Sequence, residues 1–194
     1  MGDTMHVEQP RVLMVDDERK VADAYALRLD SVADVTVAYG GREALDVIDE
    51  EAPPDVVLLD RHMPGLSGDE VLDRIREREV RTRVIMVTAI DPDLGILDMP
   101  FDDYLSKPAE REDLRAAVDQ QCQVLAYELL GEFFGMESTR AVLAAELTAE
   151  EVESHDELAD IEDRLSVTEA RVRNLLPEAG ELLSAFSGID RAGY

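Results

Sequence analysis

Five residues that could together transfer a phosphoryl group stand directly after short apolar segments of the chain. Three of them are aspartates, and carboxylates that lie close together repel each other and favour a hard cation. Mg²⁺ suits such a site, because it binds through few carboxylates, several waters and a phosphate oxygen. Phosphoryl transfer mainly requires positioning and charge compensation, which a metal ion, an ammonium group and a hydroxyl can supply. The pattern predicts a magnesium-dependent phosphoryl-transfer site with the candidate residues Asp16, Asp17, Asp60, Thr88 and Lys107.

Each candidate is a weak signal by itself, because the chain has 45 acidic side chains and most of them belong to solvated surface. Lys107 is more informative. The chain has seventeen arginines but only two lysines, Lys20 and Lys107, so a lysine after an apolar segment suggests that a compact point charge is needed there. The joint arrangement therefore favours phosphoryl transfer over ordinary surface charge.

Five apolar runs, which alternate with amphipathic segments, could bring the candidate residues together. Continuous runs predict strands buried on both faces, and their alternation with helices predicts a parallel sheet covered by helices. In a doubly wound sheet the ligand site lies beyond the carboxyl ends of the strands, which is where the candidates stand. The expected strands contain Val12–Val15, Val35–Ala38, Val56–Leu59, Val84–Val87 and Tyr104–Leu105.

Three helices are expected between these runs, because apolar residues recur there at helical spacing. The third helix has a readable start in Ser67–Glu70, a capping box in which side chains satisfy the first backbone donors. The periodic residues are Val21, Tyr25 and Leu29, then Ala44, Leu45 and Ile48, then Val71, Leu72 and Ile75.

From Ala109 onward the strands stop, and the chain becomes helical and more acidic. Helix starts are expected at Ser138 and at the box Thr148–Glu151, and helix breaks at four Gly and Pro positions, namely Gly131, Gly135, Pro177 and Gly180. Six residues then follow the spacing of a coiled-coil seam. The seam could pack against the chain's own preceding helix or against a second chain. It consists of Leu158, Ile161, Leu165, Thr168, Val172 and Leu175.

The chain resembles the response-regulator receiver family over roughly residues 10–120. The resemblance rests on Val-Asp-Asp-Glu at 15–18, Leu-Asp-Arg-His-Met-Pro-Gly at 59–65, Val-Thr-Ala at 87–89 and Asp-Asp-Tyr-Leu-Ser-Lys-Pro at 102–108. It implies an α/β fold, with a flavodoxin-like, doubly wound sheet of five parallel strands. It also implies a signalling protein that is not an enzyme beyond its own phosphorylation and slow autodephosphorylation.

By this resemblance Asp60 is the phosphoacceptor, and a sensor histidine kinase is the partner that donates the phosphoryl group. Asp16, Asp17, Asp60 and the backbone carbonyl of His62 would hold Mg²⁺. The added charge of about −2 would then bias a two-state surface that a partner reads.

The resemblance further implies that Thr88 and Lys107 bind the phosphoryl oxygens. Tyr104 would be an aromatic switch that turns inward when Thr88 moves toward the phosphoryl group. Lys107–Pro108 matches the family's cis-peptide position, and a cis proline there would aim the lysine at the site.

The chain departs from the family in one respect. Only eighteen residues separate Thr88 from Lys107, about one helical turn fewer than expected. The fourth helix, bracketed by Asp91–Pro92 and Met99–Pro100, should therefore be short or irregular. This departure casts doubt on the family's usual dimerisation surface, to which that helix contributes.

The region from about residue 124 resembles the helical output region of haloarchaeal HalX-type response regulators. We therefore expect a receiver domain over residues 1–123 and an all-helical output or interaction region over residues 124–194. The latter is a candidate coiled coil and homodimer interface. No helix-turn-helix, phosphate-binding loop or metal-ligand cluster is recognisable in it.

The composition limits the remaining functions. A formal charge of −26 with few lysines suits a halophilic protein, and it disfavours nucleic-acid binding through a basic surface. The single cysteine, Cys122, excludes an intrachain disulfide and is expected to be buried. No signal peptide or membrane span is recognisable, so we expect a cytoplasmic location.

Two other classes of function are open at this stage. One is a scaffold that works without phosphorylation, although the complete set of site residues argues against it. The other is a phosphohydrolase of the haloacid-dehalogenase type, which also uses an aspartate nucleophile on a doubly wound sheet. That class places its nucleophile in an Asp-x-Asp motif after the first strand, whereas here the first strand ends in the adjacent Asp16 and Asp17.

Overall fold

The computed structural model describes residues 9–49, 53–78, 80–89, 99–146 and 156–187. Its chain divides into two compact units, Met1–Leu125 and Ala126–Tyr194. The first unit is an α/β domain and the second is helical, which agrees with the change in sequence pattern after Ala109. Each unit is considered by itself.

The first unit is built on a sheet of five strands that are all parallel. Their order is β2-β1-β3-β4-β5, the flavodoxin-like order, so the predicted fold class is confirmed. The chain reverses its winding direction between β1 and β3, and the carboxyl ends of these two central strands lie side by side. The strands are β1 Arg11–Val15, β2 Asp34–Ala38, β3 Val56–Leu59, β4 Arg83–Thr88 and β5 Asp103–Ser106.

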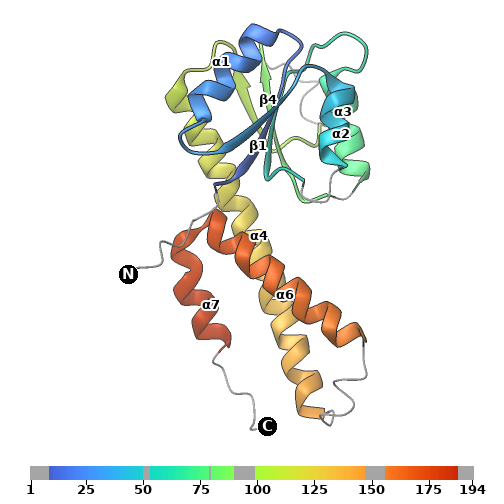
Figure 1. The fold of residues 1–194 in the computed structure, drawn as a ribbon, viewed down its shortest axis with the longest axis vertical. Helices are drawn as coiled ribbons and strands as arrows, with labels where there is room; N and C mark the ends of the chain where they lie inside the picture. Colours follow the sequence, from blue (N-terminus) through green and yellow to red (C-terminus); the bar gives the residue numbers. More distant parts are fainter. Residues whose placement is uncertain (1–8, 50–52, 79, 90–98, 147–155, 188–194) are drawn as a thin grey trace, which may run out of the picture. The chain divides into compact units, whose positions relative to one another are not determined.

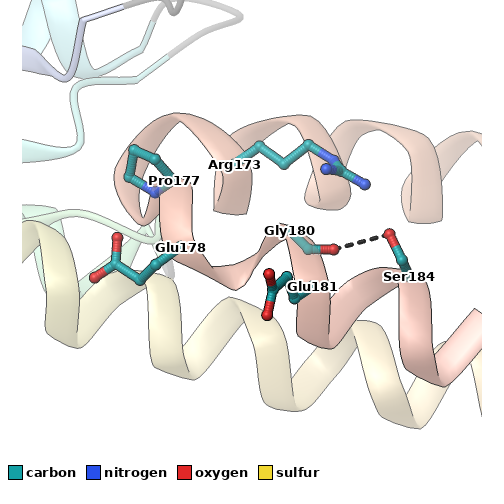
Figure 2. Close-up of a pocket in the computed structure, with 6 residues that line it drawn as sticks. All are labelled: Arg173, Pro177, Glu178, Gly180, Glu181 and Ser184. Carbon is teal, nitrogen blue, oxygen red and sulfur yellow. Dashed lines mark hydrogen bonds between the residues drawn. The ribbon is translucent and has the colours of Figure 1, made fainter.

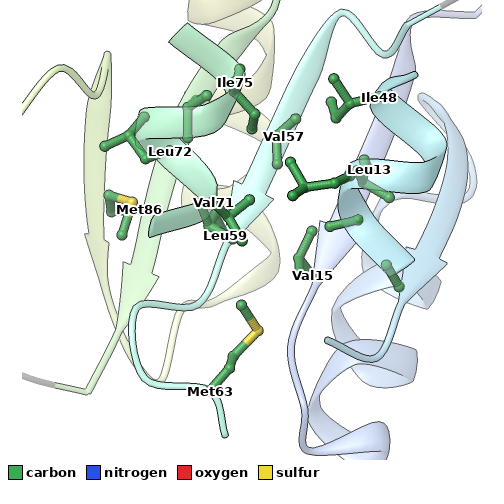
Figure 3. Packing of buried hydrophobic residues seen from close by; sticks show 14 residues of the cluster. Leu13, Val15, Ile48, Val57, Leu59, Met63, Val71, Leu72, Ile75 and Met86 are labelled. Atoms are coloured by element: carbon green, nitrogen blue, oxygen red, sulfur yellow. The ribbon is translucent and has the colours of Figure 1, made fainter. Parts of the chain in front are cut away.

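Helices cover both faces of the sheet (Figure 1). Alternate residues of the central strands, such as Leu13, Val57 and Met86, pack with the apolar faces of α2 and α3 in one buried cluster (Figure 3). The residues between them face the layer that contains α1 and the beginning of α4. These helices are α1 Arg19–Leu29, α2 Gly41–Ile48, α3 Gly68–Glu77 and α4 Arg111–Glu146.

The prediction of strands buried on both faces is right for the three central strands and wrong for β2 and β5. Every residue of β3 is buried, whereas Asp34 and Thr36 of β2 are exposed and Asp103–Leu105 of β5 are half-buried. The reason is position, because β2 and β5 are the two edges of the sheet and have a strand on one side only.

The predicted capping box at the start of α3 is confirmed. The Ser67 hydroxyl accepts from the Glu70 backbone N–H, and the Glu70 carboxylate accepts from the Ser67 backbone N–H at 3.0 Å. This cap fixes the point at which the loop after β3 turns into helix, and that loop begins with Asp60.

The predicted breaks at Gly131 and Gly135, and the predicted helix start at Ser138, are wrong. Helix α4 runs without interruption for 36 residues, through all three positions. A glycine inside a helix costs about 1 kcal/mol relative to alanine. Burial of neighbouring residues such as Leu130 and Phe133 outweighs that cost, since packing rather than propensity stabilises most helices.

The helical unit continues with α6 Asp156–Leu175, a 3₁₀ turn Pro177–Ala179 and α7 Gly180–Ser187. The predicted break at Pro177 is confirmed, whereas Gly180 has helical backbone and begins α7, so the predicted break there is wrong. The seam residues Leu165 and Val172 are buried within this single chain. Their burial supports packing of the seam inside the chain, and a coiled coil with a second chain stays a prediction.

Several expectations fall outside the described residues. They concern the fourth helix of the receiver fold, the Thr148–Glu151 box and the side chain of Leu158. Within the described part of the chain, no helix has a stretch long and apolar enough to cross a membrane. Cys122 is buried, as predicted.

Candidate functional site

Strands β1 and β3 are each followed by an aspartate at the carboxyl end of the sheet. Asp16 follows β1 and Asp60 follows β3, and the Asp60 N–H donates to the Val15 carbonyl at 2.9 Å, which continues the pairing of the two strands beyond their ends. Asp16 is similarly tied to β2, because its N–H donates to the Ala38 carbonyl at 3.2 Å. The sheet therefore fixes the backbone of both aspartates.

Three carboxylates form a cluster at the carboxyl end of the sheet. Asp16, Asp17 and Asp60 each offer a carboxylate oxygen, and these oxygens all lie within 4.8 Å of one another. Asp16 and Asp60 are buried, while Asp17 is half-buried. Such a set of oxygen ligands fits a hard cation of the size of Mg²⁺, with Asp17 facing the side open to water.

Lys107 brings a positive charge into this cluster. Its ammonium Nζ lies 2.6 Å from Asp16 Oδ2 and 3.1 Å from Asp60 Oδ1. Its backbone N–H donates to the Thr88 carbonyl at 2.8 Å, and the Lys107–Pro108 peptide bond is cis, as the resemblance implied. We call Asp16, Asp17, Asp60 and Lys107 the acidic site.

The environment of the acidic site acts in opposite directions on its two central groups. Burial raises the pKa of the Asp60 carboxyl, and the Lys107 ammonium partly opposes this rise. Burial alone would lower the pKa of Lys107, but its hydrogen bonds to Asp16 and Asp60 outweigh burial and raise that pKa. The site thus combines a desolvated carboxylate with a lysine that stays charged.

Three further predicted site residues lie in or next to the strands β3, β4 and β5. Thr88 is buried at the end of β4, and its carbonyl holds the Lys107 backbone. Tyr104 in β5 is half-buried, and its ring packs against Phe101 with centroids 6.0 Å apart. His62 is exposed in the loop after β3. Phosphoryl binding by Thr88, switching by Tyr104 and metal binding by the His62 carbonyl stay predictions.

Gly68 shapes the acidic site, and the sequence analysis treated it only as part of a helix cap. Its N–H donates to the Arg61 carbonyl at 2.9 Å. A Cβ at this position would lie 2.8 Å from Arg61 Cα and closer still to the Asp60 carbonyl oxygen, so only glycine fits. The start of α3 therefore lies in close contact with the backbone of Asp60. A glycine inside a capping box was the available signal.

Tyr25 is the second omission, since the sequence analysis counted it only as a helix core residue. Its hydroxyl accepts a hydrogen bond from the backbone N–H of Ala109, 84 residues further along the chain. A tyrosine within an otherwise aliphatic helix face was the signal, because a buried hydroxyl needs a partner.

Comparison with known proteins decides the family. Residues 12–119, more than half of the chain, match the response regulator receiver domain. The chain belongs to the response regulator receiver family. Residues 123–187 match the HalX domain, so the predicted resemblance is confirmed for both parts of this receiver protein.

Relatives of the receiver protein include longer regulators. The chain is 41% identical over 169 residues to a provisionally named transcriptional regulator of Haloferax volcanii, an alignment that covers 84% of this chain and 28% of that protein. It is 41% identical over 116 residues to YkoG, an uncharacterized transcriptional regulatory protein of Bacillus subtilis, covering 58% of this chain and 50% of that one. The chain thus spans half or less of the length of either relative.

The receiver fold is also found among solved structures. A signal receiver domain from Vibrio parahaemolyticus is 30% identical, with a TM-score of 0.59, and the match covers 64% of this chain and 98% of that one. The match therefore spans a complete receiver domain.

A shallow pocket of about 810 Å³ lies in the helical region, between the end of α6 and the start of α7 (Figure 2). Two of its polar side chains have partners within these helices. Arg173 is paired with Glu169 at 2.6 Å, and the Ser184 hydroxyl donates to the Gly180 carbonyl at 2.8 Å. The cluster of three carboxylates that could hold a metal ion lies in the receiver domain.

Proposed function

We propose that the protein is a two-component response regulator whose receiver domain accepts a phosphoryl group on Asp60 from a sensor histidine kinase. One observation carries this proposal: Asp60 lies in a cluster of three carboxylates within 4.8 Å of one another, in contact with the ammonium of Lys107. Membership of the receiver family supports it. The protein is a signalling protein that acts in the cytoplasm, and it turns over no substrate other than its own phosphoryl group.

In the proposed reaction, an Asp60 carboxylate oxygen forms a bond to phosphorus while the bond between phosphorus and the kinase histidine nitrogen breaks. The electron pair of the broken bond stays on that nitrogen, which then takes up a proton. Lys107 holds a fixed positive charge 3.1 Å from Asp60 and compensates the charge that gathers on the phosphoryl oxygens. The Thr88 hydroxyl is proposed to donate to one of these oxygens.

The carboxylates of Asp16, Asp17 and Asp60, together with the His62 carbonyl, would hold Mg²⁺. When bound, this ion supplies further positive charge to the phosphoryl oxygens and reduces the repulsion among the three carboxylates. Asp16 is preset for this role, because its Oδ1 accepts from the Glu18 N–H at 2.9 Å, which fixes its orientation.

Signal output is proposed to run through Tyr104 and the helical region. Tyr104 pairs with Met86 two residues before the end of β4, so a movement of Thr88 would reach it through the sheet. We assign residues 1–123 to the receiver and residues 124–194 to an output region that binds a partner protein or a second copy of the chain.

The test is phosphoryl uptake from acetyl phosphate in the presence of Mg²⁺. The wild-type chain is expected to gain one phosphoryl group that is stable in acid and released by hydroxylamine, which are the properties of an acyl phosphate. The Asp60→Asn variant is expected to gain none. Uptake that survives Asp60→Asn contradicts the acceptor assignment. Sustained release of phosphate from a phosphomonoester would instead support a phosphohydrolase, and equal partner binding by both proteins would support a scaffold.

Magnesium is expected to raise the thermal unfolding midpoint of the wild-type chain. A ligand at ten times its dissociation constant adds about 1.4 kcal/mol of stability. The Asp17→Asn variant should lose most of this gain, because Asp17 is the most exposed of the three carboxylates and one whose loss leaves Lys107 paired. Calorimetric scans with and without MgCl₂ at constant ionic strength measure the effect. An equal shift in both proteins contradicts the metal assignment.

A further inference from the structure

Two side chains of helix α1 hold both backbone groups of a single residue, Ala109. The Tyr25 hydroxyl accepts from the Ala109 N–H at 3.1 Å, and the Arg28 guanidinium donates to the Ala109 carbonyl. Ala109 is 2% exposed and Tyr25 5% exposed, so water does not compete freely for these bonds. The Arg28 guanidinium also lies 5.2 Å from the centre of the Tyr25 ring, which places the two side chains as one unit.

Ala109 is two residues beyond Lys107, and the intervening segment is short and rigid. The backbone N–H of Lys107 is held by the carbonyl of Thr88 at 2.8 Å. Pro108, between Lys107 and Ala109, fixes its own φ. The segment is thus anchored to β4 at one end and to α1 at the other. Its only charged side chain, Lys107, reaches from between these anchors to Asp16 and Asp60.

We infer that Tyr25 and Arg28 are positioning residues for Lys107. By holding the N–H and carbonyl of Ala109, they fix the position of the Lys107–Ala109 backbone. The position of this backbone in turn sets where the Lys107 ammonium group lies. The inference rests on the proposed function, in which Lys107 compensates the phosphoryl charge. A displacement of about 1 Å at a reacting group can cost roughly 10²-fold in rate, so a small shift of this segment would be visible.

The Tyr25→Phe variant removes the hydroxyl and keeps the ring that packs in the core. It leaves the buried Ala109 N–H without its partner, and the segment is expected to shift to regain one. Phosphoryl uptake at saturating acetyl phosphate should fall by between about 10- and 100-fold. The gain in thermal midpoint with Mg²⁺ should stay at its wild-type value, because neither Asp16 nor Asp17 is touched.

Tyr39→Phe is the matched control. The Tyr39 hydroxyl also bonds to α1, but it donates to Asp23 at 2.8 Å and has no part in holding Ala109. This variant loses the same group and is expected to retain wild-type uptake. Arg28→Met provides a second variant, because it removes the bond to the Ala109 carbonyl and keeps an apolar side chain over the Tyr25 ring.

A double-mutant cycle in the full chain separates positioning from a general loss of stability. In a Lys107→Met background, Tyr25→Phe should change the uptake rate less than twofold, because the group it positions is gone. An equal loss with and without Lys107, or equal rates for Tyr25→Phe, Arg28→Met and Tyr39→Phe, overturns the inference. These outcomes differ from failure of the proposed function, in which the wild-type chain itself takes up no phosphoryl group.

Discussion

The Lys107→Met variant is expected to take up phosphoryl groups from acetyl phosphate roughly 10²- to 10³-fold more slowly than the wild-type chain. Lys107 is the cation of the acidic site, 2.6 Å from Asp16 and 3.1 Å from Asp60, and its side chain is only 14% exposed. Methionine keeps the length of the side chain and removes the charge. The three carboxylates then lose their compensating ammonium, and so do the phosphoryl oxygens during transfer.

The matched control is Lys20→Met, because Lys20 is the only other lysine in the chain and lies exposed on α1. Its rate should stay within twofold of wild type at high salt, where charges that are separated by water are screened. Initial rates are measured at saturating acetyl phosphate and Mg²⁺, with the folded fraction of each variant checked by circular dichroism. Equal rates for the two variants would remove Lys107 from the mechanism.

The Gly68→Ala variant is expected to lose about 3 kcal/mol of stability, at the upper end of the usual cost of overpacking. The added methyl group would meet the backbone of Asp60 and Arg61, including Arg61 Cα at 2.8 Å, and a backbone cannot rotate away as a side chain can. If the variant folds, its displaced Asp60 should also take up phosphoryl groups more slowly.

Gly65→Ala is the control for this prediction, since Gly65 lies in the loop that leads into α3. Nothing lies within 4 Å of a Cβ there, but the residue has φ +82°, so alanine should cost only about 1 kcal/mol. Thermal unfolding of the two variants, followed by calorimetry, should place Gly68→Ala well below Gly65→Ala. The reverse order would show that the start of α3 is not in close contact with the backbone of Asp60.

The acidic site could be predicted from the sequence because its geometry follows from topology. Once the apolar runs are read as parallel strands, their carboxyl ends must meet, and Asp16, Asp60 and Lys107 stand at such ends. The same reasoning did not separate central from edge strands, so the exposure of Thr36 in β2 was missed. An apolar run does not reveal how many neighbours its strand has.

Other features depend on contacts that no local pattern encodes. The hydrogen bond between Tyr25 and Ala109 joins residues 84 positions apart. The close contact between Gly68 and the Asp60 backbone arises from the path of the loop between them. The uninterrupted α4 is a case of the opposite kind. Local rules predicted breaks at Gly131 and Gly135, but burial of neighbouring residues such as Leu130 and Phe133 outweighs the propensity of two glycines.

The most direct measurement of the central claim is chemical mapping of the phosphorylated residue. The wild-type chain is treated with acetyl phosphate and Mg²⁺, reduced with borohydride, which converts a phosphorylated aspartate to homoserine, and digested for tandem mass spectrometry. We predict that the reduced residue is found at position 60 alone, and that leaving out Mg²⁺ abolishes it. Reduction at Asp16 or Asp17 in place of Asp60, or no reduced residue in a chain shown to be folded, would contradict the account.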